Sequence, residues 1–207
     1  MIESSYRKKN KLKMRNVFLD MGGNKGQGLR QFIQKYNIDS SWIVETFEPG
    51  KECELEKEIK DLEYVKVNNL AIWKYTGKVK FSVFHGAGDV SLDSQGSSVE
   101  CLMSDGPSGD VNVWDFRKHD DIVEVDCISI SDVLNKYNDD DFILVKMDIE
   151  GSEFSVLRKA LEDNTITKIN DLWVEWHHHH VKGEDINSVN YLKSEIIKRG
   201  IKINDWI

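Results

Sequence analysis

The sequence predicts an α/β fold in which helices cover both faces of a mostly parallel central sheet. Short apolar runs alternate with helical patterns through most of the chain, which is typical of β-α-β units. A glycine-rich turn follows the first run, and a lone acid, Glu48, ends the second. Ligands bind beside such turns in open α/β sheets, at the carboxyl ends of the strands. We therefore expect a binding site at that edge.

Apolar runs predict the strands of the sheet, at residues 17–19, 42–47, 64–67, 142–147 and 171–176. Helices are expected between them, at about residues 28–36, 51–60, 152–161 and 188–199. In one of these helices Phe154, Leu157 and Leu161 follow i, i+3, i+7 spacing and should face the sheet. Their expected role is packing.

Two further segments break the alternation of strands and helices. Residues 78–84 and 123–130 alternate polar and apolar side chains, which predicts antiparallel or edge strands. Between them, residues 86–121 are rich in glycine, serine and aspartate and contain Pro107. A loop this long inside a compact domain is usually functional or disordered. The two alternatives are a mobile cover over an acceptor pocket and plain disorder.

The composition predicts one domain. The chain has 207 residues, of which 40% are hydrophobic and 31% are charged, enough to bury a sizeable core. We expect a basic leader at residues 1–15 and a single domain at residues 16–207. The leader is interpreted as a solvated segment, the alternative being an arm for an acidic partner. We find neither an internal repeat nor a second domain.

The cysteines indicate the cellular compartment, and the net charge indicates which class of partner to exclude. Cys53, Cys101 and Cys127 are widely spaced without a CxxC pair, which argues against a disulfide framework or a zinc site and favours a reducing compartment. The sequence shows no secretory signal and no membrane-spanning run. We expect a cytoplasmic protein without a membrane partner. A net charge of −8 argues against a nucleic-acid partner, because such surfaces are normally basic.

The glycine turn indicates a nucleoside-bearing cofactor. Glycines permit left-handed backbone angles and close approach to a ligand, and the following helix start favours an anionic group. Glu48 is placed to accept hydrogen bonds from ribose hydroxyls. The G-x-G-x-x-G pattern of dehydrogenases is absent, because Gln31 stands at the third glycine position, and no phosphate loop of NTPases occurs. The residues alone do not say which nucleoside is bound.

Several blocks within residues 17–182 share one family pattern. They are Phe18-Leu19-Asp20-Met21-Gly22-Gly23-Asn24-Lys25-Gly26, Phe47-Glu48-Pro49, Asn69-Leu70-Ala71-Ile72 with Gly77-Lys78-Val79-Lys80-Phe81, Lys146-Met147-Asp148-Ile149-Glu150-Gly151-Ser152-Glu153, and Val174-Glu175-Trp176-His177. In these blocks the chain resembles the FkbM family of S-adenosylmethionine-dependent methyltransferases. The resemblance implies a Rossmann-like class I methyltransferase fold.

The chain departs from the family pattern in two places. Ile130-Ser131 stands where the family often has Leu-Asp, with Asp132 one position later. After residues 201–203 little room is left for the final antiparallel hairpin of this fold. We therefore expect a shortened C-terminal edge of the sheet, or an edge completed by a partner chain in an oligomer.

The resemblance also implies a pocket for S-adenosylmethionine. The residues that it places at the cofactor are Asp20, Gly22, Gly23, Asn24, Gly26, Glu48, Asn69 and Ala71. The acid and backbone of the first block would face the amino-acid moiety of the cofactor. Glu48 would take the ribose hydroxyls, and residues 69–71 would lie near the adenine.

Candidate catalytic residues follow from the chemistry of methyl transfer. The reaction is an in-line displacement, so the enzyme must align the acceptor, and a base can remove the proton of a hydroxyl acceptor. The candidates are Asp148, Glu150 and His177. Asp148 ends a buried strand and would act as base or fix the acceptor's hydroxyls. His177, neutral near pH 7, would act as base or acceptor contact, whereas Glu153 is equally explained as a stabilising acid at a helix start.

No metal ligand is predicted. Crowded carboxylates that hold a divalent cation are an alternative to the catalytic roles above. The run His177–His180 is not a metal motif, because consecutive side chains of an extended segment point in alternating directions. We interpret residues 178–180 as a polar loop.

The expected function is transfer of a methyl group from S-adenosylmethionine to a hydroxyl oxygen. The resemblance implies a sugar, a glycan or another small metabolite as acceptor. One alternative is a nucleic-acid 2′-O-methyltransferase that uses the basic leader and Lys146. The other is a cofactor-binding or assembly protein that keeps the fold without catalysis.

Overall fold

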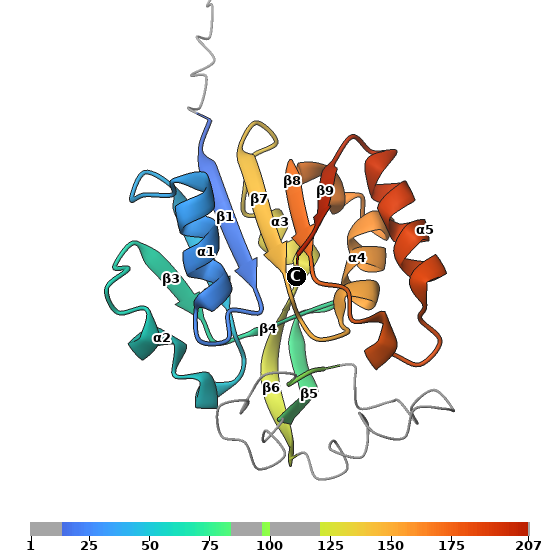
Figure 1. The fold of residues 1–207 in the computed structure, drawn as a ribbon, viewed down its shortest axis with the longest axis horizontal. Helices are drawn as coiled ribbons and strands as arrows, with labels where there is room; N and C mark the ends of the chain where they lie inside the picture. Colours follow the sequence, from blue (N-terminus) through green and yellow to red (C-terminus); the bar gives the residue numbers. More distant parts are fainter. Residues whose placement is uncertain (1–13, 84–96, 100–120, 207) are drawn as a thin grey trace, which may run out of the picture.

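The computed structural model describes residues 14–83, 97–99 and 121–206. Its centre is a six-stranded sheet with the strand order β3-β2-β1-β7-β8-β9, in which every pairing is parallel. The strands are β1 (Asn16–Met21), β2 (Ile43–Phe47), β3 (Val65–Asn68), β7 (Phe142–Met147), β8 (Asp171–Val174) and β9 (Lys202–Asp205). The predicted α/β class with a parallel central sheet is confirmed (Figure 1).

Helices cover both faces of this sheet. Alternate residues of a strand point to opposite faces, so both faces carry apolar side chains on which helices can pack. Phe18 packs into one apolar cluster, whereas its neighbours Val17 and Leu19 pack into the other. Figure 1 shows helices on either side of the strands. On the side of Phe18 lie α1 (Gln27–Tyr36) and α2 (Leu55–Glu58), and on the other lie α3 (Ile130–Leu134), α4 (Glu153–Glu162) and α5 (Ile186–Ile197).

The packing face of α4 agrees with its sequence pattern. Phe154 and Leu157 are fully buried in the larger cluster, and Leu161 packs against that cluster while partly exposed. The prediction from i, i+3, i+7 spacing is therefore confirmed.

A second, three-stranded sheet lies beyond the carboxyl ends of β1 and β7 (Figure 1). It consists of β4 (Ala71–Trp73), β6 (Asp121–Ser129) and β5 (Gly77–Val83), in that order. The antiparallel pairing of β5 with β6 confirms one predicted feature, whereas strand β4 was not predicted. Phe81 and Trp73 of this sheet share an apolar cluster with Met21 and Met147 at the central strand ends. The small sheet thus closes one side of that edge.

Two helical expectations need correction. The helix predicted at residues 51–60 is a 3-10 turn, η1 (Lys51–Cys53), followed by the short α2. Glu54 between them has φ 46°, a left-handed angle that interrupts the helical hydrogen bonds. Helix α3 was not predicted; the side chain of Ser129 caps it by accepting from the Asp132 amide at 2.9 Å.

The C-terminal edge of the central sheet is a single parallel strand. Strand β9 pairs with β8 from Asp171↔Lys202 to Val174↔Asp205. In the described part of the chain no antiparallel strand lies between or beyond them. This agrees with the expected shortened edge.

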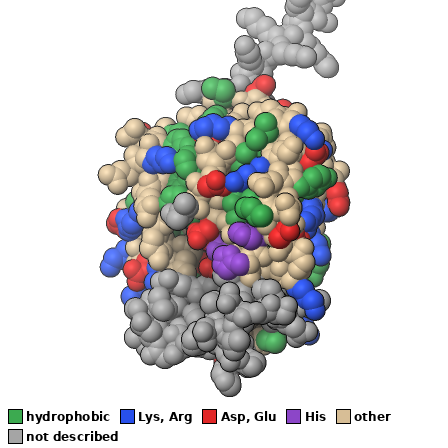
Figure 2. Space-filling view, turned by 45° about the vertical axis from the view of Figure 1, so that its right-hand side comes forward, with side chains coloured by type: hydrophobic (Ala, Val, Ile, Leu, Met, Phe, Trp, Pro, Cys, Tyr) green, Lys and Arg blue, Asp and Glu red, His purple; other side chains and the backbone are tan. Residues whose placement is uncertain are grey.

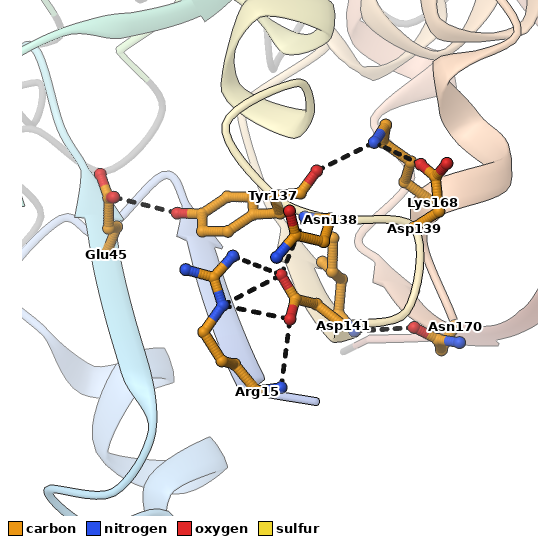
Figure 3. Close-up of polar contacts among 9 residues, drawn as sticks. Arg15, Glu45, Tyr137, Asn138, Asp139, Asp141, Lys168 and Asn170 are labelled. Carbon is orange, nitrogen blue, oxygen red and sulfur yellow. Dashed lines mark hydrogen bonds and ion pairs between the residues drawn. The ribbon is translucent and has the colours of Figure 1, made fainter. Parts of the chain in front are cut away.

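A polar network fastens the amino ends of the strands (Figure 3). Arg15 donates to Asp141 from its backbone nitrogen and from Nε, each at 3.1 Å, and the Tyr137 hydroxyl donates to Glu45 at 2.9 Å. The hydrogen bond from Arg15 lowers the pKa of Asp141 to about 2. Burial would raise this pKa, but the hydrogen bond outweighs it. Arg15, placed in the predicted leader, is thus bound to the turn before β7.

Much of the predicted leader and loop lies outside the described residues, namely residues 1–13, 86–96 and 100–120, with Cys101 among them. Within the loop, residues 97–99 are described. Ser98 bridges to Ser82 through two backbone hydrogen bonds of 2.9 and 3.0 Å. Among the described helices, none has the length and apolar character needed to cross a membrane.

Candidate functional site

A cavity of about 540 Å³, partly open to solvent, lies at the carboxyl ends of β1, β2 and β7. Polar residues follow these three strands, and apolar residues from β4 and β5 line the opposite side. The lining consists of Gly22, Asn24, Phe47, Glu48, Pro49, Ala71, Ile72, Phe81, Ser97, Val99, Asp148, Ile149, Glu150 and Ser152. The strand-end turns predicted as binding segments therefore meet at one cavity.

Gly22 is required by the packing of the strands. Its φ is +86°, and a Cβ atom there would collide with the backbone oxygen of Asp148. The amides of Gly22 and Gly23 both donate to the Phe47 carbonyl at 3.0 Å, so the turn is tied to β2. Gly22 lines the cavity, as predicted. Its lack of a side chain allows the backbone of Asp148, directly after β7, to lie close to it.

Gly23 and Gly26 lie behind the cavity wall. A Cβ on Gly23 would lie 2.3 Å from Thr46 Oγ1 and 2.8 Å from the Leu55 side chain, and one on Gly26 would lie 2.6 Å from Ile59. Gly23 therefore lets the turn pack on β2 and α2, and Gly26 lets it pack on the residue that follows α2. Neither is among the described cavity-lining residues.

Asn24 and Glu48 form the polar wall between β1 and β2. The Asn24 amide donates to Glu48 Oε2 at 2.9 Å, and the Gly50 amide donates to Oε1 at 2.7 Å. These two donors fix the orientation of a carboxylate that is mostly buried and lines the cavity. Asn24 Oδ1 is buried and has no hydrogen-bond partner among the described residues. Such an atom is satisfied by a ligand or by water.

Asp20 and Lys146 form a buried ion pair beneath the turn. Lys146 Nζ lies 3.4 Å from Asp20 Oδ1 and 3.2 Å from Asp148 Oδ2, and donates to the Gly22 carbonyl at 2.7 Å. Burial opposes the charge of Lys146, but the two carboxylates outweigh it and raise its pKa. Burial raises the pKa of Asp20, which accepts a hydrogen bond from Thr46 at 2.8 Å.

The Asp20 side chain is fully buried and is not among the described lining residues; it contacts Lys146 and Thr46. Its predicted contact with the cofactor stays a prediction. The predicted placement of Lys146 and Asp148 on one face of the strand is confirmed by their 3.2 Å contact.

The segment before β4 is only partly at the site. Ala71 is buried and lines the cavity, as the family resemblance implied. Asn69 is exposed and points to Glu56, with Nδ2 3.4 Å from Oε1. The structure therefore brings Ala71, but not Asn69, to the described cavity wall.

A strained turn joins β7 to α4 at the cavity. Glu150 has φ 54° and Gly151 has φ 103°, two successive positive angles. The fully buried Glu153 carboxylate accepts from the amides of Ile149 at 2.9 Å and Gly151 at 2.8 Å. Glu153 thus stabilises the turn that presents Asp148 and Glu150, both of which line the cavity.

His177 is buried among acids beside this turn. Its Nδ1 lies 3.1 Å from Glu153 Oε1, and its Nε2 lies 3.6 Å from both Glu150 Oε2 and Glu175 Oε1. Burial lowers its pKa, but the hydrogen bond and charge of Glu153, with the charges of Glu150 and Asp148, raise the pKa of His177 to about 9. The prediction of a neutral His177 near pH 7 is therefore wrong for these surroundings. A role as acceptor contact stays a prediction.

The following histidines form the 3-10 turn η7 (His178–His180), which replaces the extended segment assumed for them. Figure 2 shows histidine side chains beside acidic ones on one face of the molecule. No metal-capable group of three or more side chains in the described part of the chain includes residues 178–180.

Several lining residues were not predicted. Phe81 comes from β5, and Ser97 and Val99 come from the described piece of the long loop. Nothing in their local pattern sets them apart from packing residues. Ser152 could have been predicted, because it belongs to the family block at residues 146–153. Its Oγ is buried without a hydrogen-bond partner among the described residues.

Comparison with known proteins supports one family. The pattern of the methyltransferase FkbM domain matches residues 20–198. A crystal structure of methyltransferase FkbM from Methylobacillus flagellatus KT is similar over 91% of this chain and 40% of that chain, with 16% sequence identity and a TM-score of 0.48. The chain thus spans less than half the length of that protein. No match was found among curated proteins. Since the domain pattern covers most of the chain and every turn at the cavity, the chain belongs to the FkbM methyltransferase family.

Proposed function

We propose that this methyltransferase uses S-adenosylmethionine and methylates a hydroxyl oxygen of a sugar, glycan or small metabolite. The observation that carries the proposal is the convergence of three strand-end turns on one cavity. The glycine turn follows β1, Glu48 follows β2, and the turn with Asp148 and Glu150 follows β7. A nucleoside cofactor needs contacts of these kinds within one site.

The donors and acceptors of the cavity fit such a cofactor. Glu48, held by two backbone amides, would bind ribose hydroxyls. The buried, unpartnered Asn24 Oδ1 would accept from a polar group such as the ammonium of the methionine moiety. Ala71 and Ile72 would supply an apolar wall for a flat base. When bound, the cofactor supplies an electrophilic methyl group.

The chain's own contribution would be to orient the acceptor. The side chain of Asp148 is 25% exposed and that of Glu150 is 23% exposed, and both line the cavity. Either carboxylate would accept a hydrogen bond from an acceptor hydroxyl and so align its oxygen with the methyl group. Asp148 would also be a suitable base for that hydroxyl proton. Lys146 would hold this carboxylate in place through the 3.2 Å contact.

The class of acceptor follows from charge and from the family. The net charge of −8 and the acids at the cavity favour a neutral or cationic small molecule over a nucleic acid. We also keep the cytoplasm as the proposed location, because the cysteines are widely spaced in the sequence without a CxxC pair, which favours a reducing compartment.

Titration calorimetry with S-adenosylhomocysteine, using NAD and ATP as controls, tests the cofactor. We expect selective binding in the micromolar range, about −8 kcal/mol. Glu48→Ala should weaken it by about 1–3 kcal/mol, because a buried hydrogen-bonding group is lost. Glu56→Ala is the matched control, an exposed acid on α2 beside Asn69. Equal binding of NAD or ATP would contradict the proposal, and unchanged affinity in Glu48→Ala would remove the ribose assignment.

Catalysis is tested by incubation with methyl-labelled S-adenosylmethionine and a panel of sugars and hydroxylated metabolites. Asp148→Asn should lower turnover of the best acceptor by about 10²-fold or more while leaving S-adenosylhomocysteine affinity nearly unchanged. If affinity falls as well, Asp148 belongs to the cofactor site. Cofactor binding without any methyl transfer across a broad panel would favour the non-catalytic alternative.

A further inference from the structure

We propose that Asp148, Glu175 and His177 form a divalent-cation site at the rim of the cavity. One ligand atom from each of these residues lies within 4.8 Å of the other two. The set combines carboxylate oxygens with an imidazole nitrogen, a donor set that Mn²⁺ accepts. On His177 the ion would take the place of the proton on Nε2 and release it to solvent, while Nδ1 keeps its contact with Glu153. The proposal rests on the proposed function for its role, since Asp148 also lines the cavity where the acceptor would bind.

The sheet brings these residues together. Met147 pairs with Val174 in the parallel register of β7 and β8, so Asp148 and Glu175 are the next residues of adjacent strands. The Glu175 amide donates to the Met147 carbonyl at 2.9 Å, which continues this register. His177 stands two positions after Glu175. Because donors around an octahedral Mg²⁺ lie about 3–4 Å apart at bonds of 2.0–2.1 Å, small side-chain rotations would close the triad on an ion.

The surroundings carry more negative than positive charge. Among the described residues, Lys146 and His177 form ion pairs with the acids Asp20, Asp148, Glu150, Glu153 and Glu175. Burial raises the pKa values of Asp20 and Glu175 and so favours their neutral forms. The carboxylates still outnumber these two cations, which leaves an excess of acidic groups. A bound divalent cation would neutralise much of this excess.

An independent observation also points to a ligand here. Ser152 is 1% exposed and lines the same cavity as Asp148 and Glu150. Its Oγ is buried and has no hydrogen-bond partner among the described residues. A buried hydroxyl of this kind takes a hydrogen bond from a group or a water bound in the cavity, of which Asp148 is a lining residue.

The cation would deepen the proposed chemistry. Coordinated to the acceptor oxygen, it would lower the pKa of that hydroxyl and fix its position, and Glu150, which also lines the cavity, would take the hydroxyl proton as the oxygen–methyl bond forms. Asp148 would then act as a ligand of the cation, and Glu153 would orient His177 from the other side through the 3.1 Å contact to Nδ1.

The test is a Mn²⁺ titration of the full chain at pH 8, followed by electron paramagnetic resonance of the free ion. We expect one bound Mn²⁺ per chain and at least a tenfold weaker affinity in Glu175→Gln. The Glu175 side chain is 37% exposed, so its replacement should not prevent folding, which circular dichroism would verify. Asp140→Asn is the matched control, because it removes the same charge from an exposed residue at the opposite end of the sheet.

No binding, or equal affinity in Glu175→Gln and the parent, would overturn the cation site; equal affinity would place the ion elsewhere, for example on the histidines of η7. S-adenosylhomocysteine calorimetry on the same samples separates the two proposals. Cofactor binding without Mn²⁺ binding would leave the proposed function standing and remove the cation site. If the parent protein binds Mn²⁺, Glu175→Gln loses this binding, and neither sample binds S-adenosylhomocysteine, the cation site stands and the proposed function is removed.

Discussion

Acidic side chains are paired differently at the two ends of the central sheet. At the amino end, Asp141 accepts hydrogen bonds from Arg15 and from the Asn138 amide, and Lys168 pairs with Asp139 at 2.7 Å (Figure 3). At the carboxyl end, several carboxylates share Lys146 and a buried histidine. Buried polar atoms without a partner among the described residues also lie there, on Asn24 and Ser152.

This difference in hydrogen-bond satisfaction indicates which end of the sheet contributes to stability and which end is available for a ligand. A satisfied network holds two chain segments together, as Arg15 and Asp141 do for the start of β1 and the turn before β7. Unmatched buried polar groups cost about 1–3 kcal/mol each unless a ligand or a water completes them. The amino end is therefore satisfied within the protein, whereas the carboxyl end leaves groups for a ligand or water, as the proposed function requires.

The largest effect is expected from Lys146→Met. The change leaves the fully buried Asp20 without its cation and should destabilise the protein by about 3–5 kcal/mol. Lys159→Met is the control, because Lys159 pairs with Asp163 at the surface, where solvent screens the charges, and its loss should cost far less. Urea unfolding measures both. Similar costs would mean that Lys146 is not the cation on which the carboxyl end depends.

Gly22→Ala should cost about 2–4 kcal/mol in the same assay, from a left-handed angle and a collision with the Asp148 carbonyl. Gly183→Ala is closely matched, because Gly183 has the same φ of +86° but no atom lies within 4 Å of the place that its Cβ would take. It should cost about 1–2 kcal/mol, the part due to the angle alone. Equal costs would show that contact with β7 does not constrain Gly22.

Asp141→Asn tests the amino end through pH. The pKa of Asp141 is lowered to about 2 in the folded protein, below its ordinary value near 4 in the unfolded chain. Its contribution is therefore present above about pH 4 and is lost as the pH falls toward 2. We expect the variant to be about 1–2 kcal/mol less stable at pH 7, allowing for the partial exposure of Arg15, and the gap to narrow between pH 4 and 2.

Urea unfolding at pH 7, 4 and 2.5 checks this prediction, with the exposed Asp140→Asn as control. A gap between parent and Asp141→Asn that stays constant over this range would contradict the assignment of the stability to the ionised carboxylate.

The smallest effects compare one hydroxyl from each end. Tyr137→Phe removes a 2.9 Å hydrogen bond to Glu45, which keeps its bonds from Lys66 and Asn68, and should cost about 0.5–1.5 kcal/mol. Ser152→Ala removes a hydroxyl without a protein partner among the described residues, so it should cause no loss of stability and should relieve the penalty of burying that hydroxyl. Thermal unfolding resolves the two, and a larger cost for Ser152→Ala would mean that the protein itself uses this hydroxyl.

The strand pattern was enough to predict which turns form the site. Gly22, Glu48 and Asp148 each follow an apolar run, and the carboxyl ends of parallel strands meet at one edge. The same pattern predicted the antiparallel pair β5 and β6 and the buried face of α4. These features depend on hydrophobic periodicity and on glycine, which are local properties of the chain.

Other features of the site depend on neighbours that are distant in sequence. Phe81 and Val99 reach the cavity because the small sheet packs against the strand ends, and Asp20 faces Lys146 because of the β1–β7 register. The charge on His177 is set by Glu153 and Glu150, which the turn before α4 holds beside it. The sequence by itself determined the strands, the turns and the chemical types at their ends. Only the tertiary structure decided side-chain direction, burial and protonation, because these depend on the electric field and packing of residues that the chain brings together on folding.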